Sequence, residues 1–125
     1  MAIGVDIEET AEFLSCIRLN HERAQQVLER IAADLEWLGN KLKRGDYIAH
    51  IPAHLREQAL DGLCDREVTG NGVAFLAQMD KDAADQAVLA SNESKLNEDG
   101  TAVILDGGKV GKSARYVAPN LATLS

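Results

Sequence analysis

The feature that most constrains the fold of this 125-residue chain is a regular heptad of apolar residues. Starting at Leu14 and stepping alternately by three and four residues, seven of nine positions are Leu or Ile. The nine positions form what we call the heptad seam: Leu14, Ile17, His21, Ala24, Leu28, Ile31, Leu35, Leu38 and Leu42. Asp6 suits an N-cap, and Gly45 follows a basic last turn. The pattern therefore predicts one helix over about 7–44.

The predicted helix is long for a chain of this size. It would extend about 55 Å, whereas a compact chain of 125 residues is only about 36 Å across. Either it breaks, most plausibly at Asn20-His21 or at Gly39, or it projects and buries its seam against another chain. Because the heptad stays in phase through His21, we favour continuity and expect at least a dimer, in which this polar residue fixes the register. Flanking apolar residues widen the stripe and favour a helical bundle.

The remainder of the chain predicts shorter elements. Pro52 suits the first turn of a helix over 52–63, and the glycines of "CDREVTGNG" indicate a loop after it. Residues 73–91 fit a helix or a strand followed by a helix, with Asp80 as a candidate cap, and we favour helix. Residues 101–118 fit a C-terminal β-hairpin, with a turn at Asp106-Gly107-Gly108. We expect a single α+β domain that is mainly helical.

The stretch "AVILDGGKVGKS" resembles a phosphate-binding loop, because Gly111-Lys112-Ser113 matches the end of GxxxxGK[ST]. The first glycine of that motif is replaced by Asp106, which is unfavourable at the mouth of an anion site. Only 12 residues follow Ser113, too few for the helix and parallel sheet that such a loop needs. We therefore interpret the stretch as a β-hairpin turn and expect no nucleotide or other cofactor.

The best candidate metal ligands are weak. His50 and His54 are four residues apart, and Glu57 and Asp61 continue the same helical spacing. A helix that begins near Pro52 leaves His50 outside, so the two imidazoles need not converge. We interpret these residues as ordinary surface or capping groups.

Trp37-Leu38-Gly39, after a long helix, is similar to the turn motif of the small secreted WXG helical-hairpin proteins. The resemblance covers three residues and the length of the preceding helix. Pro52 and the 70–72 loop interrupt what would be a long second helix, so we do not assign the chain to that family. Trp37 lies outside the heptad seam, and it is either a flanking packing residue or an exposed anchor for a partner.

The charge of the chain is uneven. Residues 1–100 carry 10 basic and 19 acidic side chains, whereas the last 25 residues carry three basic and one acidic. The acidic body argues against direct binding to nucleic acid. The three basic residues, Lys109, Lys112 and Arg115, form a patch that fits the acidic surface of a neighbouring copy.

The N-terminus and the cysteines bear on the compartment. No apolar run approaches the ~20 residues of a membrane span, and "MAIGVDIEE" lacks the basic and apolar regions of a secretory signal. Cys16 and Cys64 have no CxxC spacing and fit reduced thiols. We expect a cytoplasmic protein.

These observations favour a non-enzymatic protein-binding module, an adaptor or stoichiometric inhibitor that acts as a helical homo-oligomer. The heptad seam and Trp37 are its expected binding surface. Two alternatives stay open. One is a small metal-dependent hydrolase that uses His50, His54 and Glu57, and the other is an acidic mimic of nucleic acid that blocks a DNA- or RNA-binding protein.

Overall fold

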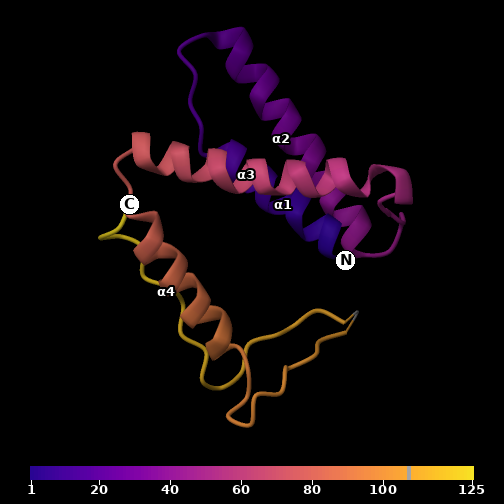
Figure 1. The fold of residues 1–125 in the computed structure, drawn as a ribbon, viewed down its shortest axis with the longest axis vertical. Coiled ribbons are helices and arrows are strands. Elements are labelled where there is room, and N and C mark those ends of the chain that lie inside the picture. The colour runs from indigo at the N-terminus through magenta and orange to yellow at the C-terminus, as the bar shows by residue number, and fades with distance from the viewer. Residues whose placement is uncertain (107) are drawn as a thin grey trace. The chain divides into compact units, whose positions relative to one another are not determined.

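A computed structural model describes residues 1–106 and 108–125. The described chain contains helices α1 (Ala2–Ser15), α2 (Glu22–Lys43), α3 (Arg56–Leu76) and α4 (Lys81–Ser94), with a short 3₁₀ helix at Ala53–Leu55 before α3 (Figure 1). It divides into two compact units, Met1–Pro52 and Ala53–Ser125. The prediction of a mainly helical protein is confirmed. Among the described residues, no helix is both long enough and apolar enough to cross a bilayer.

The first unit is a helical hairpin of α1 and α2. The predicted continuous helix over 7–44 is wrong, because the chain leaves the helix after Ser15 and re-enters it at Glu22. His21 is the N-cap of α2, and its Nδ1 accepts a hydrogen bond from the backbone N–H of Ala24 at 3.3 Å. The break satisfies an orphan helix donor and lets the apolar sides of both helices pack within one chain.

Two glycines allow α1 and α2 to approach closely. A Cβ at Gly4 would lie 2.9 Å from the Cβ of Leu42 and 3.0 Å from the carbonyl oxygen of Gly39. A Cβ at Gly39 would lie 2.9 Å from the carbonyl oxygen of Gly4. Glu8 of α1 pairs with Lys43 of α2 beside this crossing. Gly39 of the Trp37-Leu38-Gly39 sequence therefore lies inside α2, at the point where α1 crosses it, and is not part of a turn.

Helix α2 ends as the sequence predicts. Gly45 has φ 78°, the N–H of Asp46 donates to the carbonyl of Lys41 at 3.0 Å, and the N–H of Gly45 donates to the carbonyl of Leu42 at 3.2 Å. This pair of bonds is a Schellman motif, which satisfies the last carbonyls of the helix.

The second unit differs from the sequence prediction in its helix boundaries. Helix α3 runs from Arg56 to Leu76, so the predicted loop at 64–72 is helical and 73–76 is the end of α3. Gln78, with φ 60°, reverses the chain after α3. Asp80 then caps α4 as predicted, because its Oδ1 accepts from the N–H of Ala83 at 3.1 Å.

The predicted C-terminal β-hairpin over 101–118 is wrong. The described residues form no strand, only isolated antiparallel bridges at Leu96–Ala102 and Ile104–Val110. The Gly107 part of the predicted turn lies outside the described residues.

The reason for the missing β-hairpin lies at the end of α4. Ser113, which follows the bridge at Val110, bonds to the end of α4. Its N–H donates to the carbonyl of Lys95 at 3.1 Å, and its Oγ donates to the carbonyl of Ser94 at 2.9 Å. The N–H of Val117 donates to Ser94 Oγ at 2.9 Å. The returning segment therefore satisfies groups at the end of α4 instead of a strand. Its last residues run back along the helix, and the N–H of Asp80 donates to the carbonyl of Leu124 at 2.8 Å (Figure 1).

The core of the described chain is small. Its buried apolar residues other than glycine are three alanines, Ala11, Ala32 and Ala74. No large side chain in the described ranges is fully buried. Native domains of this size ordinarily bury many Leu, Ile, Val and Phe side chains. The described chain therefore leaves many large apolar side chains exposed to solvent.

Candidate functional site: exposed apolar surfaces

Helix α3 is the most exposed of these surfaces. Leu60 is 64% exposed, Leu63 51% and Val68 69%. At the end of the helix Phe75 is 81% exposed. Ala74 is the buried residue of this 21-residue helix. Large exposed apolar groups are common at binding surfaces, so α3 is a candidate for one.

The composition of α3 makes a lone helix unfavourable. Gly62, Gly70 and Gly72 lie within it, and a Cβ at any of the three would meet no atom within 4 Å. Each glycine makes the helix about 1 kcal/mol less favourable than alanine would, and isolated helices are marginal even with good formers. The helix therefore has low intrinsic propensity, and Ala74 is its one buried residue among those described.

A second apolar surface lies at the start of α2, and we call it the α2 patch. It is a hollow lined by Leu19, Ala24, Val27, Leu28 and Ile31, with His21 and Arg23 at its edge. Ile31 is 44% exposed and Leu19 45%. Leu19 is held in place because its backbone N–H donates to Gln25 Oε1 at 2.8 Å. The loop before α2 and the first turns of that helix therefore present one ordered apolar surface.

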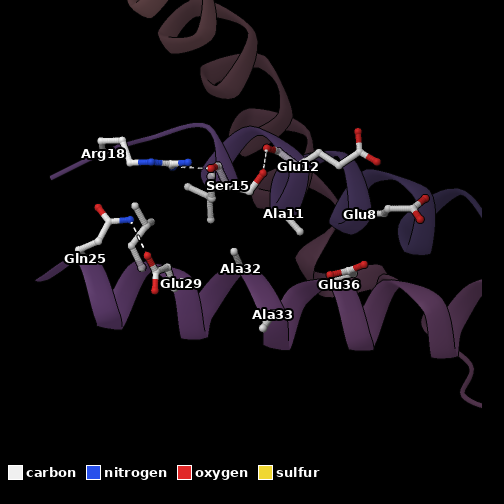
Figure 2. Close-up of a pocket in the computed structure, with 12 residues that line it drawn as sticks. Glu8, Ala11, Glu12, Ser15, Arg18, Gln25, Glu29, Ala32, Ala33 and Glu36 are labelled. Atoms are coloured by element: carbon white, nitrogen blue, oxygen red, sulfur yellow. Dashed lines mark hydrogen bonds between the residues drawn. The ribbon is translucent and has the colours of Figure 1, made fainter. Parts of the chain in front are cut away.

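A groove between α1 and α2 has a different character. Figure 2 shows Ala11 and Ala32 facing each other across the gap between the two helices. The groove has four carboxylates along its sides, Glu8, Glu12, Glu29 and Glu36. Arg18 is the basic residue of its lining, and its guanidinium donates to the carbonyl of Ser15 at 2.7 Å. This groove is acidic, with small residues at its floor.

The predicted heptad seam is divided between several environments. Leu14 lies near the end of α1, Ile17 lies in the connection, and His21 caps α2. Five seam residues of α2 are half-buried: Ala24, Leu28, Leu35, Leu38 and Leu42. Ile31 is exposed in the α2 patch. The helix break thus gives His21 a capping role in place of the expected position within a continuous seam.

Trp37 is 55% exposed, and it lies in a small aromatic cluster near the end of α2. Its ring lies 6.0 Å from that of Tyr47, with 53° between the planes, and the Nζ of Lys41 is 6.0 Å from its centroid. Lys41 also pairs with Asp46 at 2.8 Å, and this hydrogen bond and charge lower the pKa of Asp46 from its ordinary 3.8. Trp37 is therefore both packed against neighbours and open to solvent.

The candidate metal ligands are not assembled into a site. His50 precedes the 3₁₀ helix, His54 lies in it, and Glu57 lies in the first turn of α3. A search of the described residues finds no group of three or more His, Cys, Asp or Glu side chains placed to hold a metal ion.

The basic residues near the C-terminus have separate contacts. The Nζ of Lys112 lies 4.5 Å from the ring centroid of Tyr116, a cation–π contact. Arg115 donates to the carbonyl of Asn97 at 3.4 Å, and Lys109 is exposed. Of the three basic side chains of the predicted patch, Arg115 thus contacts residues near the end of α4, and the contact of Lys112 lies within the C-terminal segment itself.

Sequence reasoning missed α3 as a surface because it ended the helix at residue 63. The sequence offers little signal for the longer helix, because the apolar three-and-four spacing stops after Leu63: the next position is Glu67, and Gly70 follows it. Comparison of the chain with protein-family models, with curated proteins and with solved structures finds no match in any of the three.

Proposed function

We propose that this chain is a non-enzymatic protein-binding module of the cytoplasm, an adaptor or stoichiometric inhibitor that acts as a helical homo-oligomer. The observation that carries the proposal is the scarcity of buried apolar side chains in the described chain, together with the exposure of Leu, Val and Phe along α3. Burial of such surface is the dominant favourable term in protein association, at about 25 cal/mol per Å².

In this proposal the two apolar surfaces have separate roles. Helix α3 holds copies of the chain together, because a helix with three interior glycines needs a permanent partner. The α2 patch holds the second protein, because the loop residue Leu19 and the helix residues Val27 and Ile31 already form an ordered apolar surface. Groups such as Arg23 at the edge provide the polar rim that protein interfaces commonly have.

The experiment that tests this function uses one charge within the α2 patch. Ile31→Asp puts a carboxylate into the lining of the patch, where desolvation on binding would be costly. Gln26→Asp introduces the same charge at an exposed position of α2 outside the patch and is the matched control. We expect the wild type and Gln26→Asp to retain the same stoichiometric partner in affinity capture, and Ile31→Asp to lose it.

The folded state of the variants is checked by circular dichroism, and their mass by light scattering. Since Ile31 lies outside α3, the mass of the free protein should not change in either variant. Capture of an equal amount of partner by Ile31→Asp would show that the α2 patch is not the binding surface and would overturn the proposal.

A further inference from the structure

We infer that α3 pairs antiparallel with α3 of a second copy of this chain, with Arg56 of each copy opposite Glu67 of the other. The inference rests on the oligomeric part of the proposed function and names its geometry. It starts from a stripe of four residues on α3, at spacings of four, three and four: Arg56, Leu60, Leu63 and Glu67. We call these residues the α3 stripe. This spacing puts them along one side of the helix, as the core positions of a heptad lie.

The α3 stripe is complementary to itself when it is reversed. In an antiparallel pair centred between Asp61 and Gly62, Leu60 of one copy meets Leu63 of the other, and Arg56 meets Glu67. Along one helix the stripe is basic, Leu, Leu, acidic, and the residues opposite it on the reversed helix are acidic, Leu, Leu, basic. Each position therefore faces a complementary residue. A two-fold interface requires this property, because each contact occurs twice with the roles of the two chains exchanged.

A parallel pair of the same helices is disfavoured. It would place Arg56 against Arg56 and Glu67 against Glu67 of the other chain, and like charges opposite each other disfavour that arrangement. The antiparallel pair instead makes two ion pairs, one at each end of a leucine centre. Charge complementarity thus selects both the partner, a second copy, and the orientation.

The exposure and neighbours of the α3 stripe agree with this pairing. Leu60 and Leu63 are 64% and 51% exposed, and Arg56 and Glu67 are exposed as well. In the part of the chain that the structure describes, neither Arg56 nor Glu67 has an ion-pair partner. Ala59 and Cys64 flank the two leucines. Side chains of this small size let two helices approach closely around a leucine centre.

The pairing is compatible with the glycines of α3. Gly62 lies away from the stripe, and Gly70 continues it beyond the overlap of the two helices. An added Cβ at either residue would meet no atom of the described chain within 4 Å. Packing of the leucine centre against a second copy supplies the stability that these glycines remove.

The test is a charge exchange measured by sedimentation equilibrium of the full chain. Arg56→Glu and Glu67→Arg each convert both ion pairs of the dimer into like-charge contacts. We expect each single variant to raise the dimer dissociation constant by about tenfold or more. The double variant R56E/E67R restores opposite charges in the same register, and its dissociation constant should return to within about threefold of the wild type.

Asp65→Lys is the matched control, because Asp65 is exposed on the side of α3 opposite the stripe. Its dissociation constant should stay close to that of the wild type. Circular dichroism of each variant checks that the α1–α2 hairpin remains folded. A double variant as weak as the two single changes combined, or single variants as tight as the wild type, would overturn the antiparallel pairing.

The outcome is separate from that of the capture experiment. A wild-type protein that stays monomeric at high micromolar concentration would overturn the α3 pairing, whether or not the α2 patch still captures a partner. Conversely, loss of capture in Ile31→Asp without any change of mass would support the α2 patch as the binding surface. The charge-exchange variants of Arg56 and Glu67 then decide whether α3 pairs as inferred.

Discussion

At the scale of single residues, glycine has two opposite roles in this chain. Gly4 and Gly39 lie where α1 and α2 cross, and the added Cβ of either would come within about 3 Å of the facing helix. Gly62 lies in α3, where an added Cβ would meet nothing within 4 Å. The first two glycines permit packing, whereas the third only weakens a helix.

The first prediction compares two Gly-to-Ala substitutions. Gly39→Ala should lower the free energy of unfolding by about 1–3 kcal/mol, because the methyl group would meet the backbone of α1. Gly62→Ala should raise the stability of α3 by about 0.5–1 kcal/mol, because it adds no contact and removes backbone freedom from the unfolded chain. Urea denaturation followed by circular dichroism measures both. A destabilised Gly62→Ala would contradict the open environment of α3.

The second prediction concerns the pH dependence of the Lys41–Asp46 pair. The hydrogen bond and charge of Lys41 lower the pKa of Asp46 from 3.8. Because the folded pKa is the lower one, the pair's contribution to stability is present above the ordinary pKa and is lost as the pH falls through the lowered value. In Lys41→Met the pKa of Asp46 should rise toward its ordinary value, as measured by carboxyl NMR titration. An unchanged pKa would show that the pair does not form in solution.

At the scale of elements, the sequence predicts some helix ends and misses others. Asp6, expected as an N-cap, lies inside α1, and the helix expected to end at residue 63 continues to Leu76. Gly45 and Asp80 mark the end of α2 and the start of α4 as expected, because each acts through local backbone chemistry. The sequence favours no break before His21, because the heptad spacing continues without interruption from α1 through the connection into α2. Phase alone does not distinguish a continuous helix from two helices that fold back on each other.

The errors in the second unit have a related cause. Gly70-Asn71-Gly72 has the composition of a turn, yet it is helical in α3. The residues after Gly111 have the pattern of a returning strand, yet Ser113 and Val117 bond to groups at the end of α4. In the C-terminal segment, bonds to residues distant in the sequence override the local preference for a strand. Among the described residues no such contact is seen at Gly70 and Gly72, where an added Cβ would meet no atom within 4 Å. The candidate metal ligands rest on spacing and the basic patch on local charge, and neither shows where the side chains converge.

At the scale of the whole molecule, we propose that folding and association of the second unit are one process. A chain that buries only alanines among its described apolar side chains has little core to hold a 21-residue helix by itself. If α3 is ordered by a second copy, its helical structure depends on protein concentration, as in obligate homodimers. The α1–α2 hairpin, which packs within one chain, does not share this dependence.

The measurement that tests this claim most directly is amide hydrogen exchange of residues 56–76 over a range of protein concentrations, with the mass followed in parallel. We expect protection of α3 to rise as the dimer forms and to disappear below the dissociation constant, while protection of α1 and α2 changes little. An α3 that is equally protected at every concentration, in a protein whose mass is that of the monomer, would contradict the account.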